Sequence, residues 1–99
     1  MATYYVKTTQ EEIEAERFEE GNIDNFISFL SGECCSWVIN SGKVAIVKFP
    51  FGHIKELIVL KGDYVVKGYE IPNTIPKPLH EFHVMTKNEF ESNYLEIES

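Results

Sequence analysis

The sequence contains a single arginine, Arg17, and its nine basic residues are outnumbered by sixteen acidic ones. Binding to nucleic acid without sequence preference requires clustered Lys and Arg side chains that displace counterions from phosphates. The net charge of −7 and the scattered lysines therefore predict that the protein does not bind nucleic acid. An anionic membrane surface is disfavoured as a partner for the same reason.

Long hydrophobic runs are also missing. The longest apolar runs, such as Leu57–Leu60, are four residues, whereas a membrane-spanning helix needs about 18 or more. The first seven residues lack the apolar stretch of a secretory signal, so we expect a protein of the cytoplasm. The only two cysteines, Cys34 and Cys35, are neighbours, which can rarely form a disulfide with each other. This agrees with a reducing compartment.

Motifs for catalysis and for cofactor binding are absent too. The chain has no Gly-x-x-x-x-Gly-Lys phosphate loop and no Gly-x-Gly-x-x-Gly element. Cys34 and Cys35 lie in a segment without the cationic or basic neighbours that activate a nucleophile. Glutamates are so frequent that no pair of carboxylates stands out. We therefore expect neither enzymatic activity nor a cofactor.

The sequence does contain short segments with clear periodicity. Residues 11–20 are ambiguous, because their composition favours a helix whereas their alternation favours a strand, which we prefer. Apolar residues at i, i+3, i+4 and i+7 then predict a helix that has Asn22 as its N-cap and ends near Gly32. Alternating segments separated by turns predict an antiparallel meander of four strands, at residues 36–39, 43–49, 54–60 and 64–69.

The C-terminal part has different signals. Three prolines within residues 70–79 predict a long loop, because proline cannot donate to a sheet ladder. A short strand is expected at residues 81–85. Thr86 and Glu89 have the spacing of a capping box, which predicts a closing helix.

The predicted fold is therefore a single α+β domain over residues 1–99. It consists of a small antiparallel β-meander, alternatively curled into a partial barrel, with a short N-terminal helix and a C-terminal helix. Residues 44–47 and 57–60 are apolar at consecutive positions, so both faces of the sheet carry aliphatic side chains. Covering four of them contributes about 6–12 kcal/mol, which is comparable with the net stability of a domain. Either the curled sheet, the helices or another subunit must cover them, and we favour a homo-oligomer.

The remaining chemistry points to binding. Aromatic residues make up 13% of the chain, and a Tyr with a Lys on one face of a strand can stack on a base and hold a phosphate. Tyr69 and Lys67 are predicted to share such a face with Val65, opposite Tyr64 and Val66. Other lysines that could hold phosphates are Lys43, Lys48 and Lys77. The candidate ligand-binding residues are Tyr69, Lys67, Trp37, Tyr64, His80, His83 and Lys77.

The histidines do not predict a metal site. His80 and His83 are three positions apart on an expected strand, which places them on opposite faces, so that they cannot bind one metal ion. His53 follows Gly52 in a turn and is expected to be solvated. We therefore predict no bound metal.

Four segments follow one another with a recognisable order and spacing over most of residues 12–95. They are Ile13-Glu14-Ala15-Glu16-Arg17-Phe18, Phe29-Leu30, Gly62-Asp63-Tyr64-Val65-Val66-Lys67-Gly68 and Phe90-Glu91-Ser92-Asn93-Tyr94. In these segments the chain resembles a family of small bacteriophage and prophage proteins of Gram-positive hosts, whose most specific element is Gly-Asp-Tyr/Trp-Ile-Ile-Lys-Gly. The family pattern also favours a strand over residues 12–18. The chain departs from it at residues 70–79 and at His80 to His83, where the relatives are shorter.

The resemblance implies an accessory protein that acts in the cytoplasm of the infected bacterial host. Small, acidic, oligomeric phage proteins without enzymatic motifs often counter bacterial immunity. The favoured prediction is a protein that binds and sequesters a small nucleotide immune signal, such as a cyclic dinucleotide. The alternative is an acidic inhibitor that docks on a host defence effector through Glu12, Glu14 and Glu16. A second alternative is a phage factor with no role in defence.

Overall fold

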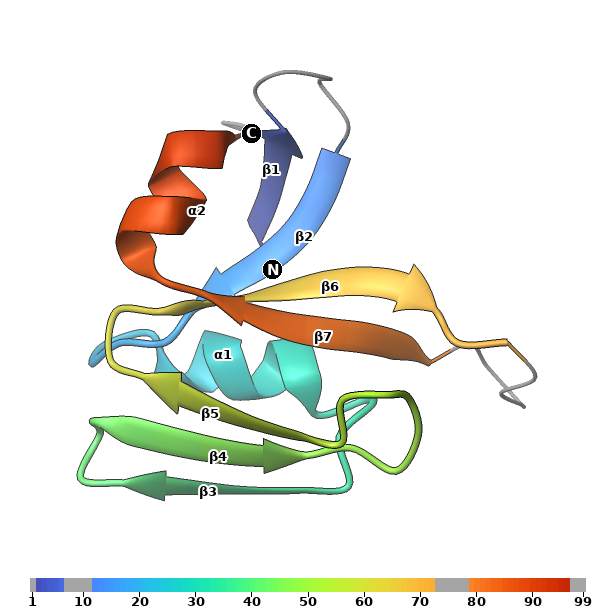
Figure 1. The fold of residues 1–99 in the computed structure, drawn as a ribbon. Helices are drawn as coiled ribbons and strands as arrows, with labels where there is room; N and C mark the ends of the chain where they lie inside the picture. The colour runs from blue at the N-terminus through green and yellow to red at the C-terminus, as the bar shows by residue number, and fades with distance from the viewer. Residues whose placement is uncertain (1, 7–11, 73–78, 97–99) are drawn as a thin grey trace.

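The computed structural model describes residues 2–6, 12–72 and 79–96 of the chain (Figure 1). They form two antiparallel sheets and two helices, so the predicted α+β class with an antiparallel meander is confirmed. The strands are β1 (Ala2–Val6), β2 (Glu12–Arg17), β3 (Ser36–Asn40), β4 (Val44–Lys48), β5 (Glu56–Leu60), β6 (Tyr64–Glu70), β7 (His80–Met85) and β8 (Tyr94–Glu96). The helices are α1 (Ile23–Leu30) and α2 (Lys87–Asn93).

The strands are divided between a small sheet and a large sheet. The small sheet has the order β3-β4-β5 and is the predicted meander, whereas the large sheet has the order β7-β6-β2-β1-β8. Neither sheet closes on itself among the residues that the structure describes, so the alternative of a curled barrel is not realised. Segment 12–17, which was ambiguous, is a strand.

The assignment of β6 to the meander was wrong. After β5 the chain turns at Gly62, which has a φ of 95°. The backbone of Phe18 accepts a hydrogen bond from the N–H of Gly62 (2.6 Å), and its own N–H donates to the carbonyl of Asp63 (2.9 Å). These two bonds draw the chain towards β2, so that Val66 pairs with Ala15 in the large sheet. The turn therefore sends β6 from one sheet to the other.

The large sheet is covered on both faces. One face, with Val65 and Phe82, packs on α1 and on the inner face of the small sheet. Figure 1 shows α1 between the β6–β7 hairpin and the small sheet. The other face, with Tyr64 and Val66, packs on Phe90 of α2. Neither helix of this described part is long and apolar enough to cross a membrane.

Both predicted helices are confirmed, but only α2 has the N-terminal side-chain cap that the sequence predicted. Thr86 is the N-cap of α2, and its hydroxyl accepts a hydrogen bond from the N–H of Glu89 (3.3 Å), as the capping box predicts. The Asn22 side chain was expected to cap α1. It donates instead to a Glu16 carboxylate oxygen (3.1 Å) and to the carbonyl of Arg17 (2.9 Å), so it ties the helix start to β2.

The small sheet has one buried and one open face. Ala45, Val47, Leu57 and Val59 are buried against the core. The alternate residues Ile58 and Leu60 have exposed fractions of 58% and 53%. Within the described part of the chain, the second apolar face is thus left uncovered by the protein itself. The homo-oligomer that was inferred from these residues stays a prediction.

Candidate functional site

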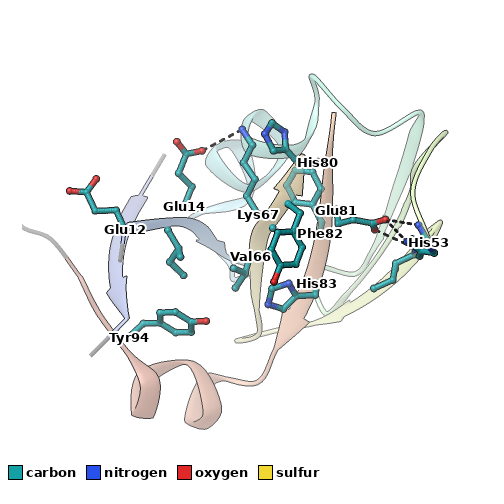
Figure 2. Close-up of a pocket in the computed structure, with 14 residues that line it drawn as sticks. Glu12, Glu14, His53, Val66, Lys67, His80, Glu81, Phe82, His83 and Tyr94 are labelled. Carbon is teal, nitrogen blue, oxygen red and sulfur yellow. Dashed lines mark hydrogen bonds and ion pairs between the residues drawn. The ribbon is translucent and has the colours of Figure 1, made fainter. Parts of the chain in front are cut away.

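An open pocket of about 760 Å³ lies along β2, β6 and β7 (Figure 2). We call it the β6–β7 pocket; His53 and Ile54 of the β4–β5 loop and Tyr94 complete its lining. Four of the seven candidate ligand-binding residues line it, namely Lys67, Tyr69, His80 and His83. Residues that the sequence suggested for one binding site are thus brought together from two strands.

One side of the pocket is a network of charged side chains. Lys67 Nζ lies 3.4 Å from a carboxylate oxygen of Glu14 and 3.5 Å from one of Glu33. Glu33, which is largely buried, also contacts Nδ1 of His80 at 2.9 Å. Figure 2 shows Glu14, Lys67 and His80 gathered on this side. The charge of Lys67 is therefore already compensated by two carboxylates.

The other side of the pocket is aromatic. Figure 2 shows Tyr94 and His83 there, away from the charged network. The Tyr94 ring stacks on Phe90 with 4.6 Å between ring centroids, and Phe90 stacks on Tyr64 at 4.0 Å. The stack of three rings holds the Tyr94 side chain in position on this side of the pocket. Desolvation lowers the pKa of His83, which favours its neutral form at pH 7.

Tyr69 stands at the open rim of the pocket. Its exposed fraction is 87%, the largest among the exposed large hydrophobic residues. The pairing of β6 with β7 shifts register between Lys67 and Glu70, and Tyr69 lies within this irregularity. The predicted separation of Val65 from Tyr64 and Val66 is confirmed, since Val65 belongs to one core and the other two residues to the second.

A carboxylate joins the pocket to the β4–β5 loop. Glu81 accepts hydrogen bonds from the backbone N–H groups of His53 (2.6 Å) and Ile54 (3.4 Å). The N–H of His53 is the main cause that lowers the pKa of Glu81. A Cβ on Gly52, whose φ is 103°, would lie 2.7 Å from the carboxylate, so the close approach needs glycine. The His53 ring is solvated, as expected, and lies 3.3 Å from Glu81.

The other candidates lie elsewhere. Tyr64 is buried behind the pocket wall, in the ring ladder, and Trp37 lies on β3 in the small sheet. Lys77 falls outside the described residues. Of the three glutamates proposed for docking, Glu12 is exposed and Glu14 is paired with Lys67. Glu16 is buried and bonded to Asn22, so it is not on the surface that the docking alternative requires.

Sequence reasoning missed three residues of the site. Glu33 is 47 positions from His80, and no local pattern indicates that the two meet. Glu81 was passed over as one of many glutamates, although its position between His80 and Phe82 on a predicted strand was a usable signal. Tyr94 was not among the candidate residues, and the structure places it at the start of β8, beside the pocket.

The donor set limits what the pocket can do. Among the described residues, no group of three or more His, Cys, Asp or Glu side chains is placed to hold a metal ion. The lining contains one lysine against Glu12, Glu14 and Glu81. This excess of carboxylates disfavours ligands of high negative charge, and the carboxylate oxygens can accept hydrogen bonds from a ligand. A planar ligand with amino groups and little negative charge fits this lining.

Comparisons with protein-family models, with curated proteins and with solved structures find no match to the chain.

Proposed function

We propose that the protein is a non-catalytic accessory protein that binds and sequesters a small nucleotide immune signal, such as a cyclic dinucleotide, in the β6–β7 pocket. The observation that carries the proposal is the convergence of Lys67, Tyr69, His80 and His83 on one pocket of suitable size. The setting, a phage protein in the cytoplasm of the infected host, rests on the sequence resemblance alone.

The aromatic side offers a place for the base. Tyr94 is held in position by its stack on Phe90, so little ordering is needed when a ligand arrives. Tyr69 is free to lie over a base at the rim, because most of its surface is exposed. A base stacked on an aromatic side chain contributes about 1–3 kcal/mol to binding.

The charged side selects among nucleotides. A phosphate near Lys67 has to compete with Glu14 and Glu33, which already contact its ammonium group. Each additional negative charge on the ligand also meets the lining glutamates. A cyclic dinucleotide carries one negative charge per nucleotide, so we expect it to bind better than a nucleoside triphosphate. The carboxylates can in turn accept hydrogen bonds from amino groups of the base.

Native mass spectrometry with a panel of cyclic dinucleotides, ADP-ribose derivatives and ATP tests the proposal. We expect one cyclic dinucleotide to be retained in a fixed ratio and ATP to be lost. Tyr69→Ala should weaken that complex about 5- to 150-fold, the equivalent of one lost stack. Phe51→Ala removes another exposed ring, 54% exposed, that lies outside the pocket lining, and should leave the complex unchanged. Retention of no nucleotide by the wild type would exclude sequestration, and the same spectra measure the oligomeric state.

The second candidate is inhibition of a host effector through the acidic strand β2. The exposure of Glu12 supports it, but Glu16 is buried and Glu14 is paired, so the available acidic surface is smaller than the sequence suggested. Glu12→Lys should then abolish protection of phage in infected cells, and salt should weaken the complex with the effector. If neither Glu12→Lys nor Tyr69→Ala changes protection, the protein has no defence role of either kind.

A further inference from the structure

Strand β3 forms an edge of the small sheet. Among the described residues its one partner strand is β4, and Figure 1 shows β3 at the margin of the molecule. Its sequence, Ser36-Trp37-Val38-Ile39-Asn40, includes no charged residue and no proline, and its register with β4 is continuous. Edge strands are usually protected by charges, prolines or bulges, because a regular edge is a template for pairing with a further strand.

The hydrogen bonds of the small sheet show which backbone groups face this edge. The N–H of Lys61 donates to the carbonyl of Lys43 (2.9 Å), at the end of the β4–β5 pair. Bonded positions alternate along an antiparallel pair, so the odd-numbered residues of β4 bond to β5 and the even-numbered ones to β3. The even-numbered residues of β4 pair with the even-numbered residues of β3. Trp37 and Ile39 therefore direct their N–H and C=O groups away from β4, to the open edge.

The opposite edge of the same sheet, β5, is protected. The N–H of Leu60 donates to a carboxylate oxygen of Asp63 (3.3 Å), and its carbonyl accepts a hydrogen bond from the N–H of Asp63 (2.9 Å). Glu56 adds a charged side chain at the other end of β5. An added strand would meet occupied backbone groups and a carboxylate on β5, but neither on β3. The small sheet is therefore built to be extended on one side only.

We propose that β3 pairs with β3 of a second copy of the chain, antiparallel about a two-fold axis at Val38. The two small sheets then form one continuous sheet. Val38 lies opposite its own counterpart, and Trp37 lies opposite the partner's Ile39. Each Trp37–Ile39 pair exchanges two backbone hydrogen bonds, which use the groups that face the open edge. This inference does not rest on the β6–β7 pocket, which belongs to the large sheet.

The side chains of β3 favour its own copy as the partner strand. The strand has no charges, so self-pairing opposes no like charges. Trp37 is 46% exposed and shares a face with Ile39, which packs against the core. Opposite the partner's Ile39 it completes a pair of an aromatic with a β-branched residue, which is favourable across two strands. An unrelated strand would meet the same backbone groups without this match.

The protected edge at β5 limits the assembly to a dimer. Each copy offers one open edge of the small sheet, and a two-fold pair uses both of them, so the sheet closes without further growth. The interface consists of one short strand from each copy, so we expect a dimer that dissociates on dilution.

Substitutions at Val38 test the proposal. Val38 is 55% exposed, so the monomer should accept a charged side chain there. Val38→Lys places two ammonium groups across the axis and should raise the dissociation constant of the dimer about tenfold or more. Val38→Glu should do the same with two carboxylates. A mixture of the two variants places opposite charges across the axis and should restore the dimer. Sedimentation velocity over a range of protein concentrations measures all four samples.

Ile58→Lys is the matched control. Ile58 is 58% exposed and lies in the same cross-strand row as Val38, but on β5. A lysine there should leave the dimer unchanged, and melting curves confirm that each variant folds. A wild type that stays monomeric up to about 1 mM would overturn the proposal. So would a dimer that survives both Val38 variants, one that Ile58→Lys weakens equally, or a mixture of Val38→Lys and Val38→Glu that stays monomeric.

Discussion

Replacement of Phe82 by alanine should separate the two sheets more than any other single core change. Phe82 is 1% exposed on β7, in the large sheet. Its ring stacks on Phe49, which follows β4 of the small sheet, with centroids 5.1 Å apart and planes at 11°. It also meets Phe29 of α1 edge-to-face at 5.8 Å. One side chain therefore joins both sheets and the helix between them.

The expected cost follows from these contacts. A buried Phe→Ala change costs about 3–5 kcal/mol, and the two ring pairs place Phe82 at the upper end of that range. We expect a loss of about 4–5 kcal/mol, which is a large part of the roughly 5–15 kcal/mol that stabilises a domain. In a domain of this size, each kcal/mol lowers Tm by about 4–8 °C.

Urea unfolding followed by circular dichroism measures this loss. Phe51→Ala is the matched control, because that ring is 54% exposed and its removal should change stability by less than about 0.5 kcal/mol. The double variant with Phe49→Ala should show a coupling of about 0.5–1.5 kcal/mol. A loss below about 2 kcal/mol for Phe82→Ala, or no coupling with Phe49, would refute the reasoning that this ring holds the sheets together.

Three further predictions concern single interactions. Thr86→Ala should cost about 1 kcal/mol in thermal melts because α2 loses its cap at Glu89, whereas Thr86→Ser should retain the stability; equal melting of all three proteins would contradict the cap. The pKa of Glu81 is lowered from 4.5, so its contribution to stability is present above pH 4.5 and is lost as the pH falls through the folded-state value. Glu81→Gln should flatten the acid limb of the pH–stability curve, and an unchanged limb would show that the bonds to the β4–β5 loop do not matter. The pKa of His83 is lowered from 6.5, so its contribution is complete above pH 6.5 and declines as the pH falls below that value. His83→Gln should remove that decline, and an NMR titration of the ring that gives a pKa at or above 6.5 would contradict the desolvation of His83.

Local periodicity sufficed for most elements of this fold. Each of α1, β4, β5 and α2 has its own buried residues, and β3 packs Ile39 partly against the core, so their patterns are visible in the sequence. β6 was placed in the wrong sheet because its sequence would suit either one. The backbone hydrogen bonds of Phe18 with Gly62 and Asp63 direct β6 to its partner strand. These residues are more than forty positions apart, and the periodicity of a segment does not predict contacts over such a separation.

The strands β1 and β8 were missed for a related reason. β8 is three residues long and exists as a strand through its pairing with β1, in the register of Tyr5 with Leu95. Such a short segment carries too few positions to show alternation. Its strand conformation is therefore a property of the assembled sheet and not of the segment.

The candidate site was half predictable. Lys67, Tyr69, His80 and His83 lie on strands whose existence the sequence predicts, so their convergence follows once β6 pairs with β7. The ion pair of Lys67 with Glu33 could not be predicted in the same way, because Glu33 lies in the connection between α1 and β3. Because Lys67 is paired with two carboxylates, less of its charge is available to a phosphate, which favours a cyclic dinucleotide over a nucleoside triphosphate.

The net charge of the sequence does not predict the charge of any one surface of the folded protein. The alternative function assumed an acidic docking surface at Glu12, Glu14 and Glu16, yet the net charge of −7 is unevenly distributed, with +3 on residues 34–61 and −10 on the rest of the chain. Antiparallel pairing of β4 with β5 brings Lys43 next to Lys61, so lysines that are scattered in the sequence gather at the ends of one sheet. At physiological salt, charges more than about 8 Å away are largely screened. Lys61 is itself paired with Glu20 at 3.9 Å, and Lys48 lies across from Glu56, so the positive charge of residues 34–61 is partly compensated where these lysines lie. The charge that a partner meets therefore follows from the folded surface and not from the total of the chain or of one stretch of it.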